Sequence, residues 1–141
     1  MKIASLLLGA ILLTYDTRGQ LSAGYQLGQA PFAQIGYEIG ERWQPEARIY
    51  PFGSLENTGV GLALMYDVFH REATDVFLGL GLGYSAVFLD EIQAIIPIGI
   101  LVRPLADRRF GIRAELDLDI GGWDAALTGT VGVRWVFRRD N

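Results

Sequence analysis

The sequence predicts an all-β fold, a closed antiparallel up-and-down barrel of eight strands whose apolar face points outward. Segments of alternating apolar and small or polar residues recur along the chain, and no stretch after residue 20 shows a helical period. The clearest segment, residues 76–88, reads V-F-L-G-L-G-L-G-Y-S-A-V-F. Glycine occupies its second face, where a strand exposed to water would carry polar side chains.

The two faces of this segment meet different surroundings. One face carries large apolar side chains and the other is nearly bare, with Leu78, Leu80 and Leu82 alternating with Gly79, Gly81 and Gly83. We expect the leucines to face lipid and the glycines to face a narrow lumen. There, small residues leave room for long side chains that cross from the far wall.

Turn-rich breaks separate eight such segments, at residues 21–28, 32–39, 46–52, 59–69, 76–88, 92–103, 110–120 and 123–137. Their lengths suit transmembrane strands, for which about 9 to 11 tilted residues cross a bilayer. Eight antiparallel strands form the smallest common transmembrane barrel.

The segments differ in how clearly their alternation assigns residues to the lipid face or the lumen face. In residues 21–28 and 32–39 apolar residues alternate regularly with small and polar ones. Residues 46–52 are the least regular, because Pro51 interrupts them and Glu46 and Arg48 share the parity of Tyr50. The pattern leaves the face of this segment open.

The later segments alternate more regularly. Residues 59–69 set aliphatic residues against glycine and alanine, and residues 92–103 repeat isoleucine on one face. In residues 110–120, Leu116 and Leu118 belong to an apolar face that we expect to meet lipid. Residues 123–137 alternate up to Phe137.

The N-terminus differs from the rest of the chain. Lys2 precedes the mostly aliphatic run 3–13, which is too short to span a bilayer as a helix, and a mostly polar run follows it. This pattern is typical of a secretory signal peptide, with cleavage expected after Gly19. We therefore predict a signal peptide at 1–19 and a barrel domain at 20–141. The alternative is an uncleaved helix packed on a soluble domain.

Alternation alone does not decide which face is inside, because soluble lipocalin-like barrels alternate as well. Three features favour the membrane form: glycine faces that would make a poor soluble exterior, a preceding export signal, and aromatic residues near segment ends. Those aromatic residues include Tyr25, Trp43, Tyr66, Trp123 and Trp135.

The pattern resembles the small eight-stranded outer-membrane barrels of the OmpA and OmpX type over residues 20–141. Members of that family typically end in a strand of alternating apolar residues with a terminal aromatic, which the insertion machinery reads. Val131, Val133, Trp135 and Phe137 are similar to this form, although four further residues follow them. The long outer loops common in the family are absent here. The resemblance implies a monomer in the cell outer membrane, in contact with its lipid bilayer and with lipopolysaccharide.

Composition limits the possible partners. The chain has 16 acidic residues against 12 Lys and Arg, which argues against nucleic acid as a partner. It contains no cysteine, which fits any compartment, including an oxidising envelope.

Charged residues on the lumen faces predict a plug. One half of the lumen would hold four acids and four bases, which can neutralise one another and exclude a wide pore. The expected network consists of Glu38, Asp67, Arg103, Arg113, Glu115 and Arg134, with Glu46 and Arg48 in the same half.

The other half of the lumen would hold Asp117, Asp119 and Asp124 without a base. Water could reach these acids, they could share a proton, or they could bind a cation. They are the candidate cation cluster, although calcium requires six or more oxygen ligands.

No catalytic constellation, zinc spacing or cofactor motif is found in the sequence. His70 is expected to be an exposed turn residue, with no serine at a matching position. We therefore expect no enzyme and no cofactor, but an integral outer-membrane barrel with a structural, envelope-stabilising or surface-interaction role. The alternatives are a secreted lipocalin-like carrier of small hydrophobic ligands and a membrane-embedded lipid-modifying enzyme.

Overall fold

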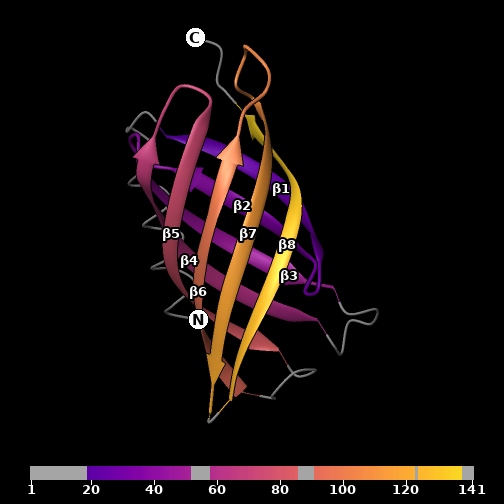
Figure 1. The fold of residues 1–141 in the computed structure, drawn as a ribbon. Coiled ribbons are helices and arrows are strands. Elements are labelled where there is room, and N and C mark those ends of the chain that lie inside the picture. Colours follow the sequence, from indigo (N-terminus) through magenta and orange to yellow (C-terminus); the bar gives the residue numbers. More distant parts are fainter. Residues whose placement is uncertain (1–18, 52–57, 86–90, 123, 138–141) are drawn as a thin grey trace, which may run out of the picture.

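The chain folds into a single closed sheet in which every strand pairs with its neighbours in sequence, and the first pairs with the last (Figure 1). The computed structural model describes residues 19–51, 58–85, 91–122 and 124–137. Its strands are β1 (Gln20–Gly28), β2 (Phe32–Glu38), β3 (Trp43–Tyr50), β4 (Gly59–His70), β5 (Thr74–Ser85), β6 (Glu91–Val102), β7 (Phe110–Gly121) and β8 (Asp124–Phe137). The described residues include no helix long and apolar enough to cross a membrane.

All eight strand pairs are antiparallel, and β1 closes the barrel on β8 from Leu21↔Phe137 to Gly28↔Thr130. The predicted fold class is confirmed. Gly19, Phe137 and the turns 39–42, 71–73 and 103–109 lie at one end, near the top of Figure 1, which we call the terminal mouth. The turn 29–31 and Gly122 lie at the opposite end, the distal end.

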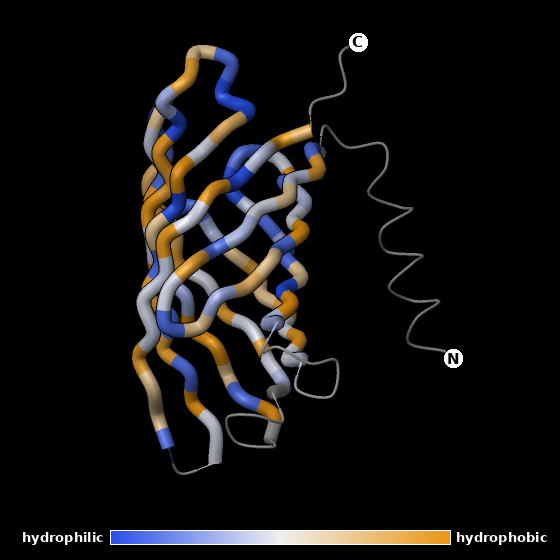
Figure 2. Tube along the Cα trace, turned by 90° about the vertical axis from the view of Figure 1, so that its right-hand side faces the viewer, coloured by the Kyte–Doolittle hydropathy of each residue, from blue (hydrophilic) through white to orange (hydrophobic). Residues whose placement is uncertain are grey.

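The barrel carries most of its large apolar side chains on the outside, whereas its interior holds polar side chains together with buried apolar ones such as Phe32, Met65 and Phe77. Hydrophobic and hydrophilic positions alternate along the strands (Figure 2). On β5, Leu78, Leu80 and Leu82 are exposed, Leu80 by 65%. Leu116 on β7 is also exposed, and Leu118 is half-buried. Among the described residues, twelve polar or charged ones are buried, three of which are arginines. This distribution is the reverse of a soluble barrel.

The glycines of β5 make room for neighbouring strands. A Cβ atom on Gly79 would lie 2.5 Å from the Met65 sulfur and 2.8 Å from Cγ of Pro97. At Gly83 it would lie 2.8 Å from Cδ1 of Ile95. The space is therefore filled by side chains of the adjacent strands β4 and β6, and the expectation of side chains from the far wall is wrong at these positions.

Strand β3 differs from its predicted segment. It begins at Trp43, three residues earlier than expected, and ends at Tyr50, just before Pro51. Gln44, Glu46 and Arg48 are buried on its lumen face. The ambiguous parity of this segment is thus resolved by the charged residues, which face inward. Residue 52 and the predicted strand positions 86–88 and 123 lie outside the described residues.

A β-bulge interrupts the pairing of β4 with β5. Asp67 pairs with Phe77 and Phe69 pairs with Val76, so Val68 is an extra residue on β4. An extra residue reverses the inside-outside alternation beyond it. As a result, His70 lies on the same side of the sheet as Asp67, although the two differ in parity.

Candidate functional site

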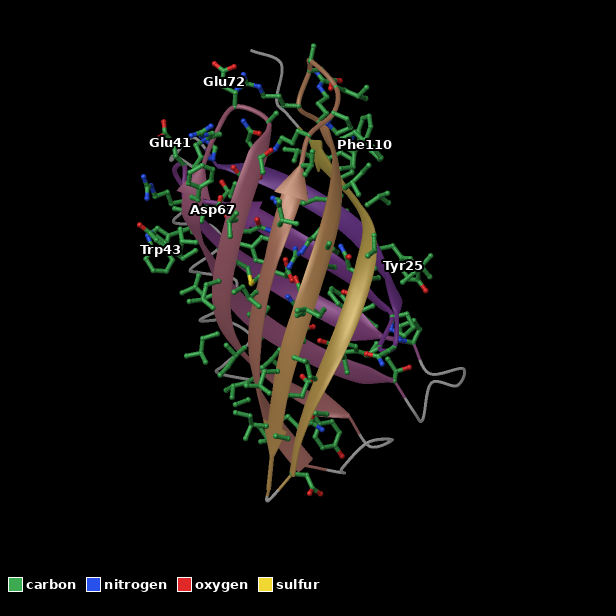
Figure 3. All side chains as sticks on the ribbon, in the orientation of Figure 1. Tyr25, Glu41, Trp43, Asp67, Glu72 and Phe110 are labelled. Carbon is green, nitrogen blue, oxygen red and sulfur yellow. The ribbon has the colours of Figure 1, made fainter. Side chains whose placement is uncertain are left out.

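Buried polar side chains lie in the lumen, and they come from β1, β2, β3, β5, β7 and β8 (Figure 3). Tyr25 and Trp43, labelled on opposite sides of the barrel, point away from it. The ionisable side chains of the lumen form two groups at different depths. The central network consists of Glu46, Arg48, Arg113, Glu115 and Asp117. The mouth cluster consists of Glu38, Asp67, His70, Asp75, Arg103 and Arg134.

Arg48 holds one side of the central network. Its Nε lies 2.6 Å from Oε1 of Glu46, and its Nη1 lies 2.8 Å from Oε1 of Glu115 and 3.0 Å from Oδ2 of Asp117. The Arg48 side chain has 0% exposure. A planar guanidinium with five donors can satisfy several carboxylates at once.

Arg113 closes the network from β7. Its Nη1 donates to Oε2 of Glu46 at 2.7 Å, and it also forms an ion pair with Glu115. Both guanidiniums stack on rings, since Cζ of Arg48 lies 4.5 Å from the centroid of Phe32 and Cζ of Arg113 lies 4.5 Å from that of Phe77. Carboxylates in the plane and rings on the faces give each buried cation a complete set of partners.

The mouth cluster lies nearer the turns of the terminal mouth. Arg134 Nη2 donates to Oε1 of Glu38 at 2.5 Å, and Arg103 forms an ion pair with Asp75 while lying 4.0 Å from Glu38. Asp75 is only 1% exposed, and its Oδ1 lies 2.6 Å from Nδ1 of His70.

A cavity of about 240 Å³ opens beside the mouth cluster and is lined by Glu38, Asp67, His70 and Arg103, with rim residues that include Glu41, Glu72 and Arg108. In Figure 3, Glu41 and Glu72 mark this rim and Asp67 lies below it. This group therefore has access to water.

The structure divides the network expected from the sequence. Arg113 and Glu115 lie in the central network, whereas Glu38, Asp67, Arg103 and Arg134 lie in the mouth cluster. Glu115 and Arg134, both placed in the expected network, do not meet: Glu115 pairs with Arg48 and Arg113, and Arg134 pairs with Glu38. Strand register explains this: Glu115 lies opposite Thr130, whereas Arg134 lies two inward positions further along β8, opposite Gly111.

The three acids proposed as a cation cluster do not act as a group. The expectation that no base accompanies them is wrong for Asp117, which pairs with Arg48. Asp119 accepts a hydrogen bond from Thr128 at 3.4 Å, and Asp124 is exposed. In the described part of the chain, the one group of three residues whose ligand atoms could hold a metal is Asp67, His70 and Asp75.

Sequence reasoning missed Asp75 and the partners of His70. His70 is exposed, as expected, but it is the last residue of β4 rather than a turn residue, and it contacts Asp75. Asp75 could have been recognised by parity, because it shares the inward face of Phe77 and Gly79. The bulge that brings His70 inward has no clear signal in the sequence.

Comparisons with known proteins agree with the architecture. A scan against protein-family models finds no match, and a search of curated proteins finds no significant match. Among solved structures, the N-terminal β-barrel domain of Pseudomonas aeruginosa OprF aligns with a TM-score of 0.66 at 17% identity, over 86% of this chain and 98% of that one.

Two further structures are similar. The de novo designed TMB2.3 has a TM-score of 0.69 at 9% identity, over 89% of this chain and 99% of that one. The outer membrane protein Ail of Yersinia pestis, solved in a phospholipid bilayer nanodisc, has a TM-score of 0.52 at 14% identity, over 86% of this chain and 100% of that one. The chain therefore has the eight-stranded antiparallel barrel fold found in small outer-membrane proteins.

Proposed function

We propose that this protein is an integral outer-membrane β-barrel with a structural, envelope-stabilising or surface-interaction role, and that its lumen is not a wide pore. One observation carries the proposal: exposed aliphatic and aromatic side chains cover the outside of a barrel whose interior holds ion-paired charges. Such an exterior is stable in lipid, and in water it would be an aggregation hazard.

Occlusion of the lumen follows from the central network. Arg48 and Arg113, from β3 and β7, meet the same acids, Glu46 and Glu115, so side chains from opposite walls meet across the lumen. Eight strands enclose only enough space for side chains, and the network uses that space. Activity as a general diffusion channel is therefore not expected. In a planar bilayer, the folded protein should show no steps of porin-like size.

A lipocalin-like carrier requires an apolar cavity. The charged lumen disfavours that alternative. A lipid-modifying enzyme would need a serine beside the histidine. Among the described residues we find no serine paired with His70, and the His70 ring nitrogen contacts Asp75 instead. Lipopolysaccharide and the insertion machinery are the partners we propose on the outer surface and at the C-terminal strand.

Fractionation tests the location directly. After expression in a Gram-negative host, carbonate extraction should leave the protein in the outer-membrane pellet. Recovery in the soluble periplasmic or extracellular fraction would reject the membrane proposal and favour the carrier.

A matched pair of substitutions tests the lipid-facing surface. Leu80→Arg places a charge on the middle of β5 and should cost about 2 to 4 kcal/mol of folding free energy in lipid vesicles. Leu105→Arg is the control, because Leu105 is exposed in the turn 103–109 outside the strands. Equal effects of the two changes would show that β5 does not face lipid.

A further inference from the structure

The bulge at Val68 brings His70 together with two aspartates, Asp67 and Asp75, at the terminal mouth. Without the extra residue, His70 would lie on the outer face, opposite to Asp67. With it, His70 pairs across the ladder with Asp75, one of the most deeply buried carboxylates in the described part of the chain. Bulges re-aim side chains, and they are frequent near functional sites.

The ligand atoms are already close to one another. One atom each from Asp67, His70 and Asp75 lies within 4.8 Å of the other two. Ligands bound to zinc at about 2.0 to 2.2 Å stand roughly 3 to 4.4 Å apart, so small side-chain rotations would bring all three to one ion.

Charge in the mouth cluster favours a cation. Three carboxylates, from Glu38, Asp67 and Asp75, face two guanidiniums, from Arg103 and Arg134. The arginines are engaged with Glu38 and Asp75. Within the described ranges, we find no ion pair or side-chain hydrogen bond for the half-buried Asp67 carboxylate. The negative charge in excess therefore lies beside the imidazole.

We propose that Asp67, His70 and Asp75 form a binding site for a divalent transition-metal ion of the zinc class. Imidazole nitrogen and carboxylate oxygen are both ligand atoms for such ions, whereas magnesium and calcium favour sites made of oxygen alone. The cavity of about 240 Å³ leaves a fourth position open to water. A metal there would supply the positive charge that Asp67 lacks.

Neighbouring side chains compete with a metal ion for the oxygens of Asp75. Arg103 already occupies one oxygen of Asp75, and the His70 hydrogen bond occupies the other. Arg134 and Glu38 pair with each other in the same cluster. At the rim, Nη2 of Arg108 lies 3.7 Å from Oε2 of Glu72. Zinc binding must therefore displace the hydrogen bond between His70 and Asp75.

The chain contains one histidine, which gives a direct probe. The untagged folded protein in lipid nanodiscs is titrated with zinc chloride and followed both by isothermal calorimetry and by the imidazole ¹⁵N resonances. One zinc ion per chain and a shift of the His70 resonances are expected. No saturable zinc binding, or binding without any change at His70, would overturn the proposal.

Three variants distinguish zinc binding at this site from nonspecific attraction of zinc to negative charge. His70→Ala and Asp67→Asn change side chains that are not fully buried, so folding should survive. Each change should weaken zinc binding by more than about tenfold. Loss of a residue that only orients a metal ligand already weakens binding by about tenfold, and loss of a ligand should cost more. Glu72→Gln is the control, since that acid is on the same rim with 92% side-chain exposure. Unchanged binding in His70→Ala, an equal loss in Glu72→Gln, or displacement of zinc by equimolar calcium would each reject the site.

Discussion

The two charge groups in the lumen have the same numbers of carboxylates and guanidiniums but different environments. Each holds three acids and two arginines. In the central network every acid lies within 3.0 Å of an arginine nitrogen, and Glu46, Arg48 and Glu115 have no exposed side-chain surface. In the mouth cluster Glu38 is 25% exposed, and Asp67 has no ion pair that we find among the described residues.

The difference shows what burial requires of charge. Away from water, an unpaired ion is very costly, and each acid of the central network pairs with an arginine. Beside a water-filled cavity, an unpaired carboxylate is tolerated, and the group can accept a ligand. We therefore expect the central network to govern stability and the mouth cluster to be available for binding.

The largest expected effect is removal of a central arginine. Arg113→Met leaves Glu46 and Glu115 with one fewer partner and should destabilise the barrel by about 3 to 5 kcal/mol. Urea unfolding in lipid vesicles, followed by tryptophan fluorescence, measures the change. Arg42→Met is the control, because Arg42 is exposed at the terminal mouth and should cost less than about 1 kcal/mol. Similar losses in both variants would contradict a dry central network.

Removal of a mouth arginine should cost less. Arg103→Met takes the guanidinium from Asp75, which keeps its contact with His70 and lies near the cavity. We expect a loss of about 1 to 3 kcal/mol, the range for one unsatisfied buried polar group. The same urea experiment compares it with Arg113→Met. A loss at Arg103 equal to or greater than that at Arg113 would remove the distinction between the two groups.

Double-mutant cycles test the boundary between the groups. Glu38→Gln and Arg134→Met share a 2.5 Å ion pair and should show a coupling energy of about 0.5 to 3 kcal/mol. Glu115→Gln and Arg134→Met belong to different groups and should add within about 0.5 kcal/mol. Strong coupling in the second cycle would mean that the lumen contains one network and not two.

The smallest expected effect is at the exposed rim. Glu72 and Arg108 form an ion pair at 3.7 Å with 92% and 46% side-chain exposure. Because solvent-exposed pairs contribute little, Glu72→Gln should change the unfolding free energy by less than about 0.5 kcal/mol, and added salt should not alter this result. A larger change, measured by urea unfolding at low and high salt, would show that the rim is part of the mouth cluster.

The number of strands, their order and most inward faces could be predicted from the sequence. Alternation has a period of two, so a run such as Leu78 to Leu82 fixes which residues share a face without reference to any other strand. Inside-out orientation was also predictable, because the faces opposite the leucines carry glycine and charge. The exception was β3, where Glu46 and Arg48 share the parity of Tyr50 and local pattern could not choose a face.

Which charges meet was decided by the tertiary structure. Arg113 reaches Glu46 across 67 positions of sequence, and Arg134 reaches Glu38 across 96, because strand tilt and stagger around the closed barrel set the depth of each residue. Parity places a side chain inside without giving that depth. The extra residue at Val68 likewise changes the face of His70, and only the pairing of β4 with β5 reveals it.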